Sequence, residues 1–224
     1  MTFRMVLQTA LMLLSMALAL FLAAGDPSWT AAWTFLVEIG ILGLAVGLWL
    51  ARTDPALLAE RLAMPWRRGQ AAWDSRFVIA LIVGFYAWLA LMGLDSQRWR
   101  WFSAMPQSLQ GVGVLAIAAG VFIAWRTFRA NRFASAAVKI QPGQTVSESG
   151  PYALVRHPMY AGAIFYFVGA PLMLGSWLGL ACAPLFVAAL GARAIGEERL
   201  LRAELPGYDA YAARVRYRFV PKVW

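Results

Sequence analysis

The chain has little charge, one cysteine and one histidine, and each shortage excludes a class of protein. Charged residues make up 14% of its 224 residues, against roughly 25% in an ordinary soluble domain. The hydrophobic share of 61% and the mean hydropathy of +0.62 exclude a disordered chain and argue against a soluble globular domain. Cys182 cannot form a disulfide within the chain, and His157 alone cannot build a multi-histidine metal site. No metal centre is therefore expected.

Long apolar stretches, in contrast, are abundant. A membrane-spanning helix needs about 20 mostly apolar residues, and several stretches approach or exceed this length. The last two are separated only by Gly175 and Ser176, which predicts a tight helical hairpin. The sequence therefore predicts an all-α fold, a polytopic membrane helical bundle of about six spans. The predicted spans are residues 5–24, 29–50, 77–94, 108–125, 160–174 and 177–195.

The first apolar stretch has a second interpretation. Arg4, the apolar run and the small residues Ala23, Ala24 and Gly25 resemble a secretory signal. The run is longer than a typical signal core, however, and a second apolar stretch follows almost at once. A first membrane span is therefore the favoured interpretation.

Basic residues predict the orientation in the membrane. Of the 20 Lys and Arg residues, 18 lie near the N-terminus, after spans two and four, or in the C-terminal tail, and only Arg98 and Arg100 lie on the opposite side. Because basic loops stay on the cytoplasmic side, both termini and the polar loops are expected there. The net charge of +9 then reflects topology and attraction to anionic lipid, so no nucleic-acid partner is expected.

Residues 1–107 are interpreted as an N-terminal anchor region with three spans and an interfacial helix. That helix is predicted over residues 54–68, with Asp54 as its cap, Pro55 in its first turn and Trp66 at the membrane surface. Residues 108–224 hold span four, the hairpin, an amphipathic tail and most of the polar residues. This second region is the expected location of any functional site.

Two features inside the spans have competing explanations. Gly111, Gly113 and Gly120 imitate a glycine-rich nucleotide loop, but no strand precedes them, so close helix packing is preferred. Such a glycine-rich face also permits a homo-oligomer. Glu38 is an ionisable residue inside span two, and it is either functional or a hydrogen-bonded structural acid.

The first polar cluster ends the long connection over residues 129–157. Such a connection in a small protein is usually functional or disordered. Tyr152, Arg156 and the single histidine, His157, gather where Pro158 begins the fifth span. Since free backbone N–H groups at a helix start can receive an anion, the cluster predicts a ligand site. The alternative is a loop that anchors itself at the membrane surface.

The second polar cluster lies where the last span emerges. Arg193 and Glu197 are four residues apart and share one helix face. They form either a surface ion pair with a snorkelling arginine or part of a site. Tyr208 and Tyr211 follow in a basic tail that alternatively lies on anionic lipid.

In this order, the two clusters resemble the isoprenylcysteine carboxyl methyltransferase and phospholipid methyltransferase superfamily of integral-membrane enzymes. Gln144 stands about where the eukaryotic carboxyl methyltransferases carry a further histidine, so a prenylated cysteine is not implied as the substrate. The matching residues are Gly150-x-Tyr152-x3-Arg156-His157-Pro158-x-Tyr160-x-Gly162, Glu197-Glu198-x2-Leu201, Tyr208-x2-Tyr211 and Arg218-x2-Pro221.

The resemblance implies methyl transfer from S-adenosylmethionine to a lipophilic acceptor, which is a carboxylate, an amine or a thiol. It implies that Arg193 and Glu197 are catalytic, with Arg193 orienting an acidic acceptor by a bidentate contact and Glu197 acting as base for an amine. It also implies that Arg193, Tyr208 and Tyr211 contact the substrate. Two alternatives remain, a membrane reductase of the sterol-reductase type that uses NADPH and a non-catalytic membrane bundle. The residues implied for the cofactor pocket are Tyr152, Arg156, His157, Pro158, Tyr160, Gly162 and Glu198.

Overall fold

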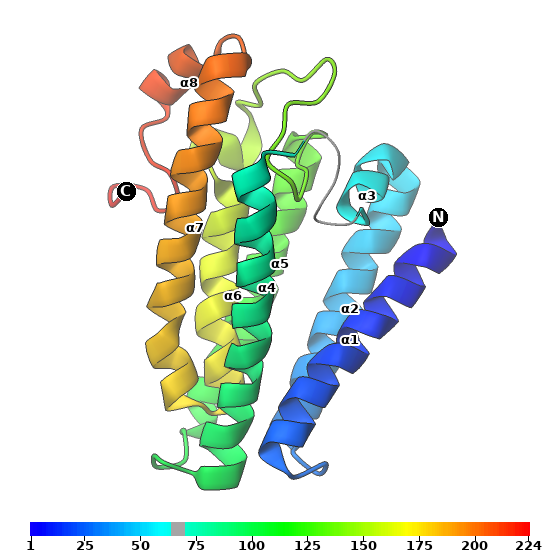
Figure 1. Ribbon diagram of the computed structural model, residues 1–224, viewed down its shortest axis with the longest axis vertical. Coiled ribbons are helices and arrows are strands. Elements are labelled where there is room, and N and C mark those ends of the chain that lie inside the picture. The colour runs from blue at the N-terminus through cyan, green and yellow to red at the C-terminus, as the bar shows by residue number, and fades with distance from the viewer. Residues whose placement is uncertain (64–69) are drawn as a thin grey trace.

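The computed structural model describes residues 1–63 and 70–224, and every regular element within these ranges is a helix (Figure 1). Five helices are long and apolar enough to cross a membrane, and the apolar helix α6, with 17 residues, is shorter. The predicted all-α bundle of about six spans is therefore confirmed. The five long helices and the shorter α6 are α1 (Thr2–Ala24), α2 (Thr30–Thr53), α4 (Ala72–Gly93), α5 (Gln107–Ala130), α6 (Pro158–Leu174) and α7 (Trp177–Glu204).

Several helices extend beyond their apolar parts. The sequence predicted that the last span ends at residue 195, but α7 continues to Glu204. Likewise α5 continues to Ala130 and α4 begins already at Ala72. Hydropathy detects only the apolar turns, whereas Glu, Arg, Leu and Ala are strong helix formers that continue the helix in a polar setting. The second polar cluster therefore lies on a rigid helix.

Close contact between α5 and α6 explains the glycines of the fourth span. A Cβ atom added to Gly120 would lie 2.6 Å from the carbonyl oxygen of Gly162, and one added to Gly113 would lie 2.5 Å from the backbone nitrogen of Met173. Gly111 has open space around it. The prediction of helix packing is confirmed for Gly113 and Gly120, whose close contacts lie within the chain, but Gly111 makes no such contact.

The interfacial helix is shorter than predicted. Helix α3 (Pro55–Arg61) begins with Pro55, and Oδ1 of Asp54 accepts a hydrogen bond from the backbone nitrogen of Leu57 at 3.0 Å, as expected for the cap. The predicted helix over 54–68 ends in the structure at Arg61, and Trp66 lies outside the described residues. Side chains of α1 hold the end of α3, because Arg4 and Gln8 both donate to the carbonyl oxygen of Leu62.

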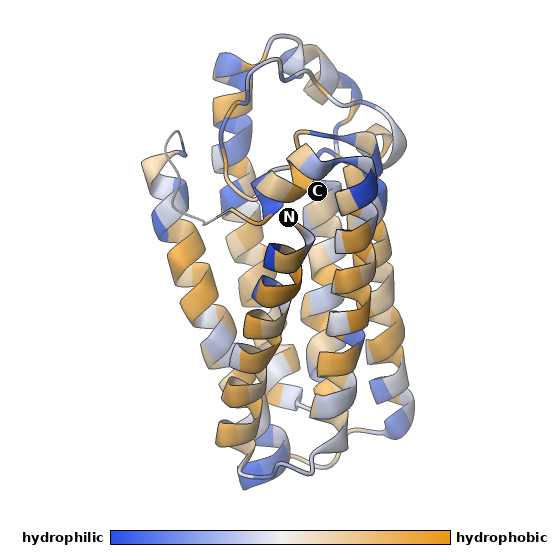
Figure 2. Ribbon diagram, turned by 90° about the vertical axis from the view of Figure 1, so that its right-hand side faces the viewer, coloured by the Kyte–Doolittle hydropathy of each residue, from blue (hydrophilic) through white to orange (hydrophobic). Residues whose placement is uncertain are grey.

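Polar residues gather at the two ends of an apolar bundle (Figure 2). The start of α1, the connection after α5 and the short helices η2 (Gly150–Ala153) and α8 (Tyr208–Arg214) lie toward one end, which we call the polar end (Figure 1). At the opposite end, Gly175 turns the hairpin with a φ of +73°, and the π-helix η1 (Leu94–Trp99) places Asp95 at 2.7 Å from the Ser176 hydroxyl. Glu38 is half-buried on α2, and its Oε2 has no hydrogen-bond partner in the described part of the chain.

Candidate active site

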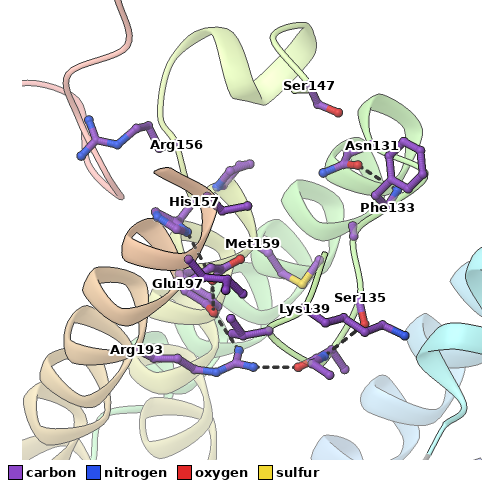
Figure 3. Close-up of a pocket in the computed structure, with 18 of the residues that line it drawn as sticks. Asn131, Phe133, Ser135, Lys139, Ser147, Arg156, His157, Met159, Arg193 and Glu197 are labelled. Atoms are coloured by element: carbon purple, nitrogen blue, oxygen red, sulfur yellow. Dashed lines mark hydrogen bonds and ion pairs between the residues drawn. The ribbon is translucent and has the colours of Figure 1, made fainter. Parts of the chain in front are cut away.

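A cavity of about 390 Å³ lies at the polar end of the bundle. Small-molecule sites usually have roughly 300–1,000 Å³. The start of α6, the later turns of α7 and the connection after α5 surround it (Figure 3). The helix α8 contributes Tyr208 and Tyr211 to the lining. The lining also includes apolar side chains from inside the spans. These are Val78 and Leu81 on α4, Ala163 and Phe167 on α6, and Leu190 on α7.

The buried guanidinium of Arg193 lies against Asp74 at the start of α4. Its Nε donates to Oδ1 of Asp74 at 2.8 Å and its Nη2 donates to Oδ2 at 3.2 Å. Nη2 also donates to the carbonyl oxygen of Ala136 at 2.7 Å. Asp74 is 0% exposed, and its Oδ2 also accepts from the backbone nitrogen of Val138 at 2.8 Å. This two-point contact fixes the plane of the Arg193 guanidinium.

Tyr160 connects Arg193 to Glu197. Nη1 of Arg193 donates to the Tyr160 hydroxyl at 2.7 Å, and this hydroxyl donates to Oε2 of Glu197 at 2.8 Å. Of the five N–H donors of an arginine, one on Nη1 has no acceptor among the described residues. Arg193 therefore has one N–H group left for a bound ligand. It can make a single hydrogen bond to that ligand, in place of the expected bidentate contact.

Glu198, the next residue on α7, holds a second network. Its Oε1 accepts from Nε of Arg156 at 2.7 Å, from Nε of Arg218 at 3.1 Å, and lies 3.2 Å from Nε2 of His157. Nη1 of Arg156 also donates to two backbone carbonyls of the C-terminal tail at 2.8 and 2.7 Å. Arg156 and Glu198 thus fasten the tail to α6 and α7, and three donors of Arg156 are already engaged.

Three tyrosines line the side of the cavity near α8. The Tyr211 hydroxyl donates to the carbonyl oxygen of Tyr152 at 2.8 Å, and the Tyr152 hydroxyl accepts from Asn131 at 2.9 Å. Burial raises the pKa of Tyr152 to about 12 and also raises the pKa of Tyr208, so both hydroxyls stay protonated. Tyr208 is 4% exposed, and its hydroxyl has no partner in the part of the chain that the structure describes. An unpaired buried hydroxyl is unfavourable, and a ligand can satisfy it.

Most of the residues implied by the resemblance line this one cavity. Two do not belong to the lining. Gly162 faces α5, where a Cβ would lie 2.8 Å from the Gly120 carbonyl oxygen, and Glu198 is buried with Arg156. The residues that do line the cavity are Tyr152, Arg156, His157, Pro158, Tyr160, Arg193, Glu197, Tyr208 and Tyr211.

The sequence did not single out Asp74 or Arg61. Arg61 on α3 lines the cavity, and Asp74 holds the Arg193 guanidinium in place by accepting its hydrogen bonds. Both come from residues 1–107, so the site draws on both parts of the chain, and the division at 107 and 108 stays a prediction. The available signal was that Asp74 is an acid in the first turn of a membrane helix.

Comparisons with known proteins give a family match and a similar solved structure. Residues 109–205 match the family model described as phospholipid methyltransferase. Among solved structures, the chain is similar to the eukaryotic intramembrane Ras methyltransferase, isoprenylcysteine carboxyl methyltransferase, with 17% identity and a TM-score of 0.48 over 93% of this chain and 83% of that chain. No curated protein sequence matches the chain.

The membrane-spanning helices and the matched segment identify an integral-membrane methyltransferase. The matched segment runs from the start of α5 to the end of α7 and contains Tyr160, Arg193 and Glu197. The match confirms the resemblance to the superfamily of isoprenylcysteine carboxyl methyltransferases and phospholipid methyltransferases that the motifs predicted.

Proposed function

We propose that the protein transfers a methyl group from S-adenosylmethionine to a lipophilic acceptor at the cytoplasmic membrane surface. One observation carries the proposal. The segment that matches the phospholipid methyltransferases also supplies the Arg193–Tyr160–Glu197 network, which lines a cavity with polar and apolar walls. The basic loops support a cytoplasmic location of the polar end.

The polar part of the cavity suits S-adenosylmethionine. The unpaired hydroxyl of Tyr208 is a donor or acceptor for a polar group of this ligand. The rings of His157 and Tyr160 are stacked, with centroids 5.3 Å apart, and aromatic faces attract cations such as a sulfonium. When bound, S-adenosylmethionine supplies an electrophilic methyl group on its sulfonium sulfur.

The chain's own residues prepare the acceptor. The apolar walls bind its lipophilic part and exclude water. A dry cavity favours the transition state of methyl transfer, because charge is dispersed in that state. Glu197 takes a proton from an amine or a thiol at a carboxylate oxygen, since Tyr160 occupies only its Oε2. A carboxylate acceptor is already ionised, and it needs only the remaining N–H of Arg193 to orient it.

The first test is the melting temperature of the detergent-purified protein with S-adenosylmethionine, S-adenosylhomocysteine and NADPH. A ligand that binds only the folded protein raises this temperature. We expect a dose-dependent rise with the first two ligands, followed by transfer of labelled methyl groups into extracted lipids. A rise with NADPH alone would overturn the proposal in favour of a reductase.

A further inference from the structure

Among the described residues, one cation of the cavity lining has no carboxylate partner. Arg61, on α3, lines the cavity, and no carboxylate of the described residues forms an ion pair with it. Glu197, which also lines the cavity, is hydrogen bonded to Tyr160. The other three cations of the lining each have a carboxylate. These pairs are Arg193 with Asp74 at 2.8 Å, Arg156 with Glu198 at 2.7 Å and Lys139 with Glu60 at 2.8 Å.

The Arg61 guanidinium is half-buried against uncharged groups. Its Nη1 lies 3.6 Å from the sulfur of Met159, and its central carbon lies 5.1 Å from the centre of the Phe128 ring. Burial and the nearby charge of Arg193 lower the pKa of Arg61. An arginine nevertheless stays protonated in proteins. A half-buried positive charge with no carboxylate partner among the described residues therefore lines the cavity, and an anion in the cavity would stabilise it.

The backbone around Arg61 is held in place. Leu57 and Leu58, on the same short helix, are buried against α1 and α2. The ion pair between Glu60 and Lys139 ties α3 to the connection after α5. Arg61 therefore approaches the cavity from a fixed element, which reduces the entropy lost when a ligand binds.

We infer that Arg61 binds an oxyanion, a phosphate or a carboxylate, that belongs to the lipophilic acceptor. The planar guanidinium can hold two oxygens of such a group at once. Helix α3 lies at the polar end of the bundle, near the level where membrane lipids carry their charged groups. Arg61 lies outside the matched segment 109–205, and the role assigned to it here is that of a specificity-determining residue. The inference rests on the proposed function for the identity of the ligand as acceptor.

Binding tests the assignment without methyl transfer. The full chain in an uncharged detergent is titrated with dihexanoyl phosphatidate, decanoate, dihexanoylglycerol and inorganic phosphate, and melting temperatures give the affinities. We expect the two lipid anions to bind and inorganic phosphate to bind far more weakly, because it lacks an apolar body. Arg61→Gln should lower the affinity for the lipid anions about ten-fold, since a charge-assisted hydrogen bond is lost.

Two variants control for folding and for general charge. Arg61→Lys keeps the charge but not the planar fork, so it should bind the lipid anion with an affinity between those of the wild type and Arg61→Gln. Arg52→Gln removes an exposed arginine of the last turn of α2, outside the cavity lining, and should leave the affinity within about two-fold. Dihexanoylglycerol should bind equally to all variants.

Three results would overturn the assignment. The first is that no lipid anion binds, or that its affinity is equal in the wild type and Arg61→Gln. The second is that inorganic phosphate binds as well as the lipid anions. The third is that Arg61→Gln weakens S-adenosylmethionine binding instead, which would mean that Arg61 binds an anionic group of the cofactor and not of the acceptor. An Arg61-dependent lipid affinity without methyl transfer would reject only the proposed function.

Discussion

Asp74 and Arg193 lie 119 positions apart in the sequence and form a two-point ion pair, with Nε to Oδ1 at 2.8 Å and Nη2 to Oδ2 at 3.2 Å. The pair joins the start of α4 to the emerging part of α7. It sets the direction of the one guanidinium N–H that is left for a ligand. The region classed as an anchor thus positions a residue of the candidate active site.

Replacing Asp74→Asn should impair both folding and turnover. Breaking a buried ion pair leaves Arg193 uncompensated, which costs about 3–5 kcal/mol. We expect a lower melting temperature and a kcat reduced by at least about ten-fold, with S-adenosylmethionine affinity retained, because the guanidinium loses its fixed plane. The double variant Asp74→Asn/Arg193→Gln should be more stable than the sum of the single losses predicts. Additive losses would show that the pair is not coupled.

Replacing Glu197→Gln distinguishes the class of acceptor. Loss of a general base lowers kcat by about 10²–10⁴ when the acceptor must lose a proton. A carboxylate acceptor needs no base, so its kcat should change far less. S-adenosylmethionine affinity should stay constant in both cases, as measured by calorimetry. A strong loss of cofactor affinity would contradict the role of Glu197 toward the acceptor.

Replacing either of two tyrosines of α8 by phenylalanine gives a matched pair of variants that differ in whether the lost hydroxyl has a hydrogen-bond partner. Tyr208→Phe removes an unpaired buried hydroxyl, so the melting temperature without ligand should stay the same or rise. Its S-adenosylmethionine affinity should fall about ten-fold. Tyr211→Phe breaks the hydrogen bond to the Tyr152 carbonyl oxygen and should cost about 1 kcal/mol of stability. Equal effects of the two variants on affinity would contradict the role of the Tyr208 hydroxyl.

Two glycines of α5 should respond in opposite directions. Gly113→Ala places a methyl group 2.5 Å from the Met173 backbone nitrogen, and such overpacking should cost about 1–3 kcal/mol. Gly111→Ala meets open space in the same helix and should stabilise the protein by about 0.5–1 kcal/mol. Thermal unfolding of both variants in the same detergent measures the difference.

The orientation can be tested with introduced cysteines. In a Cys182→Ala background, Ser149→Cys and Ser103→Cys place exposed thiols at opposite ends of the bundle. A membrane-impermeant maleimide should label Ser103→Cys in intact cells and Ser149→Cys only in inverted vesicles, because the basic loops stay in the cytoplasm. The reverse labelling pattern would place the cavity on the outer side.

Much of the fold could be predicted because its signals are local. The apolar runs predict the spans, Gly175 and Ser176 predict the turn of the hairpin, and Pro158 predicts the start of α6. Helix ends were less accurate, since α7 continues through polar residues that carry no hydropathy signal. The candidate site was predicted in its α6 and α7 parts, where characteristic residue types follow one another closely along the chain.

Local sequence patterns are enough to predict a membrane bundle with two polar clusters at one end, because hydrophobicity and helix-starting residues act over a few neighbouring positions. Which charges meet became clear only from the way the helices pack. Arg156 turned out to be engaged by Glu198, Arg193 by Asp74, and Arg61 by no described carboxylate. Such pairings depend on which helix faces approach one another in space, and no local pattern contains that information.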